Sequence, residues 1–196
     1  MDFKECCSKL KNLLVDENYN VLGYDYSEKQ LKKLPPWFYP KKKKKGLPPE
    51  LIEYVKMLEE KYPIAAQIKK KTMGQWYGPY FFFAVKADGM DYEQIKAKFK
   101  EFEQDLLKRY ELATKKTAYE IKASSYIPMN MLAFIFEEGV PDDLYNQIRE
   151  VNKDAEVGKY TRPYVFDLKN QRVDRDTGKM KVIGAPKPKM FANIFS

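Results

Sequence analysis

The chain has 196 residues, of which 44% are hydrophobic and 15% aromatic, and it carries a formal net charge of +8 with no histidine. This composition predicts one packed domain with extensions and excludes a disordered chain, which would lack enough apolar and aromatic side chains to form a core. Because histidine is absent and the only two cysteines, Cys6 and Cys7, are adjacent, a disulfide framework, Ser-His or Cys-His nucleophile pairs and most catalytic zinc sites are also excluded.

No apolar run approaches the roughly 18 residues of a membrane span. The first residues, 1–5, have neither the basic nor the apolar region of a secretory signal. We therefore expect a soluble protein in the cytoplasm.

The positive charge is concentrated in the flanks of the chain. Residues 1–77 carry 16 lysines against 10 acidic residues, and residues 169–196 carry 7 basic against 2 acidic residues. The middle segment, 78–168, has 13 basic and 16 acidic residues, so it is net negative. A polyanion would therefore be expected to contact the flanks rather than the middle.

The first predicted element is a helix over 3–15, whose apolar residues recur at spacings of three and four. Cys6 and Cys7 lie on its apolar stripe, which favours buried, unreactive thiols over a reactive dithiol.

A proline-rich connector at 35–49 contains five consecutive lysines, Lys41 to Lys45. The prolines disfavour a helix and the like charges keep the segment solvated. Two interpretations stay open: a solubilising linker, or an arm that contacts phosphates while Trp37 and Tyr39 stack on bases. The run contains no arginine, which predicts binding without sequence preference.

The next predicted helix, 49–62, begins at a proline pair and ends before another proline. Residues 64–78 are interpreted as a turn-rich segment containing Lys69, Lys70 and Lys71. Two glycines bracket Trp76 there, which indicates a loop with exposed aromatic residues, either a ligand rim or an aromatic plug.

Between 79 and 173 the pattern predicts strand, helix, strand, strand, helix, strand. The strands are expected at 80–87, 115–124, 129–136 and 164–168, the helices at 92–110 and 141–151, and Asp91 is the expected N-cap of the first of these helices. The first and third strands are apolar on both faces and so central, whereas the fourth follows Pro163 and is expected at an edge.

This order predicts an α+β fold with a ferredoxin-like split βαβ sheet. The predicted divisions are an N-terminal helical extension (1–77, with the connector at 35–49), the core (78–173), and a C-terminal hairpin strand and basic tail (174–196). Two helices cover only one face of such a sheet, so we expect the helices at 3–15 and 49–62, or a second copy of the chain, to cover the other.

The sequence contains no phosphate-binding glycine loop, dinucleotide fingerprint or complete calcium loop, and each acidic pair has an ordinary explanation at a helix start, strand end or turn. We therefore expect no enzymatic activity, no cofactor and no metal.

The favoured function is an interaction module whose basic flanks bind nucleic acid or another polyanion with little sequence preference. The expected contacts are Lys41, Lys42, Lys43, Lys44, Lys45, Lys69, Lys70, Lys71, Arg172, Arg175, Lys179 and Lys181, with Trp37, Tyr39 and Trp76 as stacking residues. The alternative is a protein-binding or self-assembling subunit that uses the sheet face or an apolar C-terminal tip. That tip consists of Met190, Phe191, Ile194 and Phe195, and it is expected to dock on its own domain or on a partner.

Overall fold

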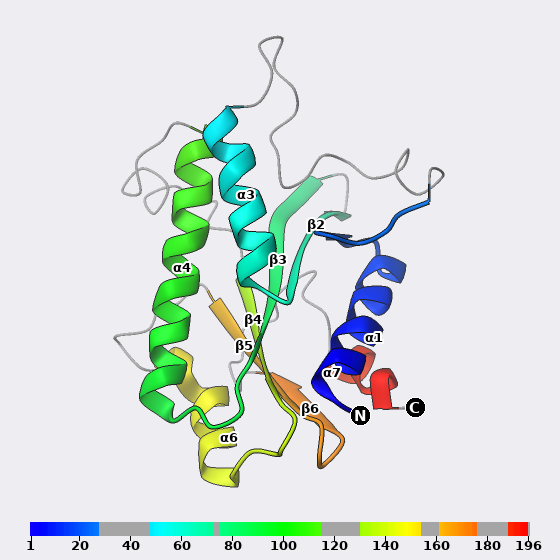
Figure 1. Ribbon diagram of the computed structural model, residues 1–196, viewed down its shortest axis with the longest axis vertical. Helices are drawn as coiled ribbons and strands as arrows, with labels where there is room; N and C mark the ends of the chain where they lie inside the picture. The colour runs from blue at the N-terminus through cyan, green and yellow to red at the C-terminus, as the bar shows by residue number, and fades with distance from the viewer. Residues whose placement is uncertain (28–47, 73–74, 115–129, 154–160, 176–187, 196) are drawn as a thin grey trace.

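The computed structural model describes residues 1–27, 48–72, 75–114, 130–153, 161–175 and 188–195, with the backbone alone for 68–72, 75–80, 114 and 152. Within these ranges, six strands form one sheet whose spatial order follows the chain (Figure 1). The strands are β1 (Asn20–Val21), β2 (Ile64–Thr72), β3 (Gln75–Lys86), β4 (Asn130–Phe136), β5 (Thr161–Asp167) and β6 (Arg172–Arg175). The helices are α1 (Phe3–Asp16), α3 (Pro49–Lys61), α4 (Tyr92–Thr114), α6 (Asp142–Glu150) and α7 (Pro188–Phe191), with 3-10 turns η1 (Val151–Lys153) and η2 (Ala192–Phe195).

Three adjacent strands of the sheet, β3, β4 and β5, are parallel. β3 pairs with β4 and β4 with β5 in parallel, whereas β1, β2 and β6 join the sheet through antiparallel pairs. Parallel neighbours require a crossover connection. The connection from β3 to β4 contains α4, and the connection from β4 to β5 contains α6. The protein is thus a mixed α and β fold with a parallel centre.

The predicted ferredoxin-like arrangement is wrong, because a split βαβ sheet is antiparallel and its strand order does not follow the chain. Two strands differ from the prediction. The lysine-rich segment taken as turns is strand β2, and β5 lies in the centre of the sheet rather than at its edge. The polar residues of β5, which suggested a solvated face, are buried. The strand expected at 115–124 lies outside the described residues.

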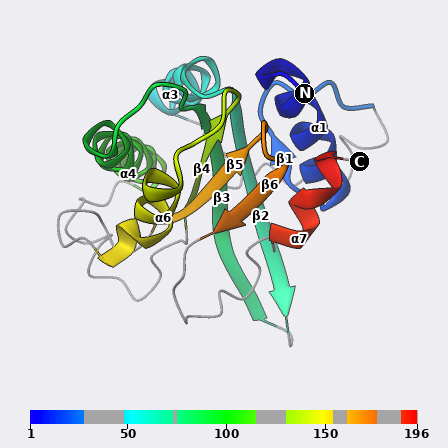
Figure 2. The same cartoon turned by 90° about the horizontal axis from the view of Figure 1, so that it is seen from below.

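Helices cover both faces of the sheet, with α3, α4 and α6 on one face and α1 with α7 on the other (Figure 2). Local sequence accounts for their starts. Asp2 caps α1 by accepting a hydrogen bond of 2.8 Å from the Glu5 backbone N–H. Asp91 and Gln94 exchange side-chain to backbone hydrogen bonds of 2.8 and 2.9 Å, which is a capping box and confirms the N-cap expected there.

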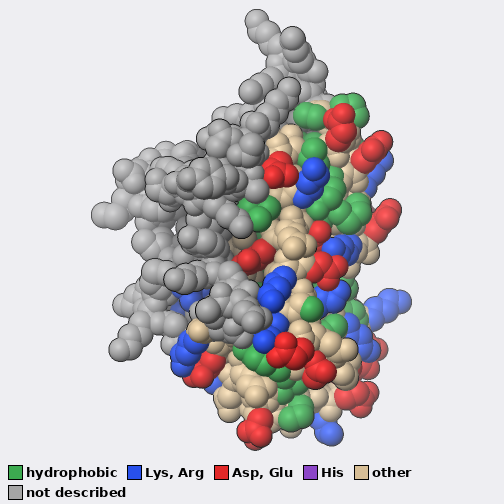
Figure 3. All heavy atoms as spheres, turned by 90° about the vertical axis from the view of Figure 1, so that its left-hand side faces the viewer, with side chains coloured by type: hydrophobic (Ala, Val, Ile, Leu, Met, Phe, Trp, Pro, Cys, Tyr) green, Lys and Arg blue, Asp and Glu red, His purple; other side chains and the backbone are tan. Residues whose placement is uncertain are grey.

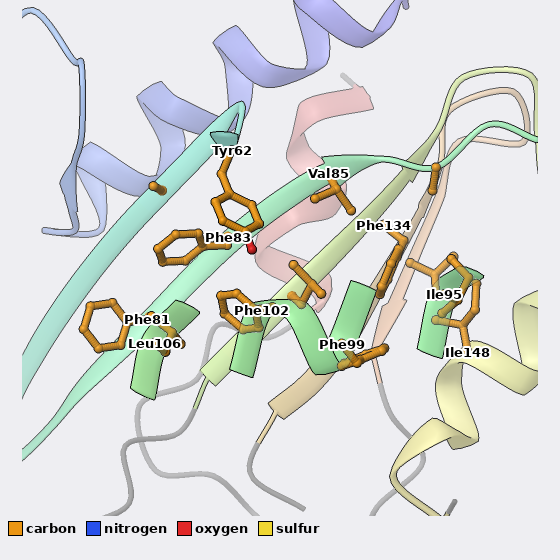
Figure 4. Close-up of a cluster of buried hydrophobic side chains, with 14 of the residues drawn as sticks. Tyr62, Phe81, Phe83, Val85, Ile95, Phe99, Phe102, Leu106, Phe134 and Ile148 are labelled. Atoms are coloured by element: carbon orange, nitrogen blue, oxygen red, sulfur yellow. The ribbon is translucent and has the colours of Figure 1, made fainter. Parts of the chain in front are cut away.

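The first core lies between the sheet and the helices α3, α4 and α6. It is rich in aromatic side chains, with Phe83 of β3, Phe99 and Phe102 of α4, and Phe134 of β4 directed toward one another (Figure 4). Ring centroids in this core lie about 5 Å apart, 5.1 Å for Phe83 with Phe102 and 5.2 Å for Phe99 with Phe134. The aromatic stripe of α4 therefore packs on the sheet as its spacing predicts.

The second core lies on the opposite face and joins the two ends of the described chain. Leu10 and Leu14 of α1 pack there with Phe82 of the sheet and with Phe191 and Ile194 of the C-terminal segment. The expectation that the helix at 3–15 covers this face is confirmed. The expectation for the helix at 49–62 is wrong, since α3 lies beside α4 on the other face.

The predicted boundary after residue 77 falls inside β3, and β1 and β2 of the N-terminal extension belong to the same sheet as the predicted core. None of the helices in the described ranges combines the length and the apolar character needed to cross a bilayer.

Candidate nucleic-acid interface

The second half of β2 (68–72) and the beginning of β3 (75–80) form a two-stranded ribbon, which we call the basic ribbon. β1 pairs with β2 only at Ala66 and Gln67, and β4 begins to pair with β3 at Phe81. Within the described part of the chain, no third strand therefore pairs with the ribbon on either side. Figures 1 and 2 show it extending beyond the other strands.

The register of the ribbon places basic residues opposite aromatic ones. Lys70 is paired with Tyr77 and Lys71 with Trp76. The pairing of β2 with β3 shifts register between Ile68 and Lys70, so the ladder is irregular where the ribbon leaves the sheet. The loop expected around Trp76 is instead part of a strand. Lysines that neutralise phosphates, next to aromatic rings on which bases stack, are the elements of a surface that binds nucleic acid without base readout.

A row of buried polar residues lies at the base of this ribbon, and we call Gln67, Asn130 and Thr161 the polar row. They occupy one register line across β2, β4 and β5, with Phe81 of β3 between the first two. Gln67 is 3% exposed, Asn130 6% and Thr161 0%. The hydroxyl of Thr161 donates a 2.9 Å hydrogen bond to Oε1 of Glu103 on α4, which shows that this row faces that helix.

The C-terminal half of α4 places Arg109 and Tyr110 against Phe81, the residue that lies between Gln67 and Asn130 in the register. The Arg109 guanidinium carbon is 5.4 Å from the Phe81 ring centroid and 5.2 Å from that of Tyr110. Burial lowers the pKa of Arg109 and raises that of Tyr110. Arginine nevertheless remains protonated near neutral pH, so Arg109 adds a buried positive charge to the Glu103 carboxylate that Thr161 contacts.

Sequence reasoning did not identify this row. Arg109 follows Leu106 by three residues on the apolar stripe of α4, and that spacing was the available signal that it points inward. The polar row itself gives no local signal, because its members are brought together only by the register of strands far apart in the chain.

A cluster of charged side chains lies at the carboxyl ends of the parallel strands β3 and β4, opposite the end that carries the basic ribbon. Lys86 Nζ lies 3.2 Å from Glu137 Oε2 and 3.6 Å from Asp88 Oδ2. Glu137 also accepts a 3.0 Å hydrogen bond from the Phe3 backbone N–H. Ligands often bind at the carboxyl ends of parallel strands. Here the charges are paired with one another and attach α1 to the sheet, and among the described residues no group of acidic and cysteine side chains could hold a metal ion.

Arg172, one of the expected polyanion contacts, is engaged within the protein. Its Nε lies 2.9 Å from Oδ2 of the buried Asp167 and its Nη1 3.0 Å from Oδ1 of Asp142, and its guanidinium lies 3.9 Å from the Tyr145 ring centroid. Burial opposes ionisation of Asp167, but hydrogen bonds from Asn170 and Arg172 outweigh it and lower the pKa of that carboxyl. The adjoining shallow pocket combines acidic and basic side chains and gives no surplus of positive charge.

The other predicted site residues are distributed as follows. Lys69, Lys70, Lys71 and Trp76 lie on the basic ribbon, and Arg175 ends β6. Lys41 to Lys45, Trp37, Tyr39, Lys179 and Lys181 lie outside the described residues. Phe191 (0% exposed) and Ile194 (3%) are buried in the second core, and Met190 and Phe195 pack against it. Of the two alternatives for the apolar tip, the structure therefore shows docking on its own domain.

Comparisons with protein-family models, with curated proteins and with solved structures find no match to this chain.

Proposed function

We propose that the protein binds nucleic acid with little sequence preference and without catalysis, using the basic ribbon and the basic flanks of the chain. The observation that carries this proposal is the register of the ribbon, in which Lys70 and Lys71 are opposite Tyr77 and Trp76 on a pair of strands with no third neighbour among the described residues. A ribbon of this kind supplies phosphate contacts and stacking surfaces along one direction.

The charges elsewhere in the molecule support the basic ribbon as the place where nucleic acid binds. On the side where α4 lies, acidic and basic side chains are interspersed (Figure 3). Several are paired along the helix itself, such as Lys98 with Glu101 at 2.8 Å and Lys96 with Glu93 at 2.8 Å. A surface neutralised in this way does not attract a polyanion. The unbalanced charge lies on the ribbon and in the flanks.

The protein-binding alternative has less support. The apolar tip assigned to a partner is packed in the second core, and Met1 is the only exposed large hydrophobic residue in the described part of the chain. Stable protein interfaces usually contain a cluster of apolar residues at their centre. We therefore retain self-association as an outcome that the binding experiment must detect.

The test is fluorescence anisotropy of labelled single-stranded and duplex oligonucleotides, titrated with the protein between about 50 and 300 mM salt. The ribbon variant carries Lys69→Gln, Lys70→Gln and Lys71→Gln. A second variant replaces Lys41 to Lys45 by Gln. The matched control for the ribbon carries Lys98→Gln, Lys108→Gln and Lys153→Gln, which removes the same charge from residues paired on helix surfaces.

We expect log K to fall linearly with log salt, and the ribbon variant to reduce the size of that slope by about two because it loses phosphate contacts. Affinity at the lowest salt should fall about tenfold or more in the ribbon variant and little in the control. Absence of binding at 50 mM salt would refute the proposal, and equal losses in the ribbon variant and the control would refute the assignment to the ribbon. Light scattering during the titration reports self-association.

A further inference from the structure

Two buried oxygen atoms of the polar row have no hydrogen-bond partner within the described part of the chain. They are Oε1 of Gln67 and Oδ1 of Asn130, in side chains that are 3% and 6% exposed. A buried polar atom without a partner costs about 1 to 3 kcal/mol, and native proteins contain few of them. Both atoms are hydrogen-bond acceptors, so the missing partner is a donor.

The surroundings restrict the chemistry of that donor. The Arg109 guanidinium lies 5.4 Å from the ring centroid of Phe81, the residue that separates Gln67 from Asn130 in the register. Arg109 and the Glu103 carboxylate, which accepts a 2.9 Å hydrogen bond from Thr161, put charges of both signs beside the row, so the row needs no further charged group. A neutral N–H or O–H donor meets the two oxygen atoms without adding to that charge.

The position of the row suggests where such a donor comes from. Gln67 directly precedes the basic ribbon on β2, and Phe81 directly follows it on β3. A nucleic acid strand lying along the ribbon therefore passes the polar row at the ribbon's base. Amide side chains recognise the amino edge of bases, and an aromatic ring with a guanidinium beside it provides a stacking surface.

From these observations we infer that the polar row binds a nucleobase with an exocyclic amino group, as in cytosine, adenine or guanine, presented by a strand on the basic ribbon. The amino group donates to Oε1 of Gln67 or Oδ1 of Asn130. Since Arg109 and Tyr110 of α4 pack on Phe81, which lies between Gln67 and Asn130, base entry displaces these side chains. This inference rests on the proposed function and adds a base preference to it.

The experiment compares 12-residue oligomers of deoxycytidine and deoxyuridine, which differ only in the groups at one edge of the ring. We expect the wild-type protein to bind the cytosine oligomer about tenfold more tightly. The variants Gln67→Met and Asn130→Leu keep the side-chain volume but remove the acceptor. Both variants should bring the ratio of the affinities for the cytosine and uracil oligomers toward one. The dependence of affinity on salt should stay unchanged. Gln147→Met, at an exposed position of α6, is the control and should keep the wild-type ratio.

Thermal unfolding of both variants shows whether they are folded, and no loss of stability is expected because each removes a buried atom without a partner. A wild-type ratio near one, or an unchanged ratio in both variants, overturns the inference while nucleic acid binding stands. Failure of both oligomers to bind at 50 mM salt refutes the proposed function and the inference with it. Calorimetry measures binding of free cytidine as well. If cytidine binds but the protein shows no preference between the two oligomers, the polar row does not read a base on a bound strand, and the inference is overturned.

Discussion

The hydroxyl of Tyr62 donates a 2.7 Å hydrogen bond to Oδ2 of Asp105, and this contact joins the end of α3 to the middle of α4. Lys61 Nζ lies 2.6 Å from the same oxygen, and Tyr54 donates to the other carboxylate oxygen at 3.2 Å. Burial and the neighbouring carboxylate raise the pKa of both tyrosines, so they remain hydrogen-bond donors across the physiological range. One carboxylate therefore holds α4 in the position from which Arg109 and Tyr110 pack on Phe81.

We predict that Asp105→Ala lowers the free energy of unfolding by about 2 to 3 kcal/mol, because it leaves the largely buried Tyr62 hydroxyl without its acceptor. The neighbouring Gln104 is exposed on the same helix, and Gln104→Ala should change stability by less than about 0.5 kcal/mol. Urea unfolding followed by circular dichroism measures both values. Equal stabilities for the two variants would contradict this role of Asp105.

The lowered pKa of Asp167 predicts a loss of stability in acid. A carboxyl whose pKa is lower in the folded state than in the unfolded one stabilises the fold above the unfolded value, near 3.9, and loses that contribution as the pH falls toward the folded pKa. Asp167→Asn should therefore be less stable than wild type at pH 7, and the difference should shrink below about pH 4. Urea midpoints across pH 3 to 7 test this, and a difference from wild type that stays constant down to pH 3 would contradict the role of Asp167.

The two cysteines should react slowly in the folded protein. Burial raises the pKa of Cys6 to about 12 and that of Cys7 to about 11, so little thiolate forms near neutral pH. We expect iodoacetamide at pH 8 to label the native protein far more slowly than the urea-unfolded chain, as read by mass spectrometry. Labelling at similar rates in both states would show that α1 does not shield these thiols.

The C-terminal segment should be a structural part of the domain. The Phe191 ring lies 5.2 to 5.5 Å from the rings of Phe82, Tyr164 and Phe166. We predict that Phe191→Ala destabilises the protein by about 3 to 5 kcal/mol, whereas Phe195→Ala, at a half-buried position, costs clearly less. Similar small effects for both would return this segment to the role of a partner-binding tip.

The helices could be predicted from the sequence because their apolar spacing is local. The stripe Ile95, Phe99, Phe102 and Leu106 reports directly which side of α4 is buried. The two-faced apolar runs of β3 and β4 likewise identified central strands. β2 was missed because its second half, Lys69 to Thr72, has no alternating apolar residues in the sequence.

The candidate site was only partly predictable for a related reason. Lysine and aromatic residues near positions 69 to 77 were visible in the sequence, but their pairing depends on a hairpin register that single-residue patterns do not contain. Asn130 and Thr161 are 31 residues apart and become neighbours only because β4 and β5 are parallel. Pro163 suggested an edge strand, but β5 is an inner strand whose Arg162 and Asp167 are buried, and a sequence does not distinguish a buried polar side chain with partners from one in water.

The second core also bears on how the chain folds during synthesis. Successive strands are neighbours in the sheet, so each can pair with the one before it as the chain emerges from the ribosome. The layer that contains Phe191 and Ile194 cannot close until residues 188–195 have left the exit tunnel. Until then α1 covers only part of this face, and the rings of Tyr164 and Phe166 lack the Phe191 side chain that packs on them. Such a surface is a target for chaperones until residues 188–195 pack on it and bury this apolar face.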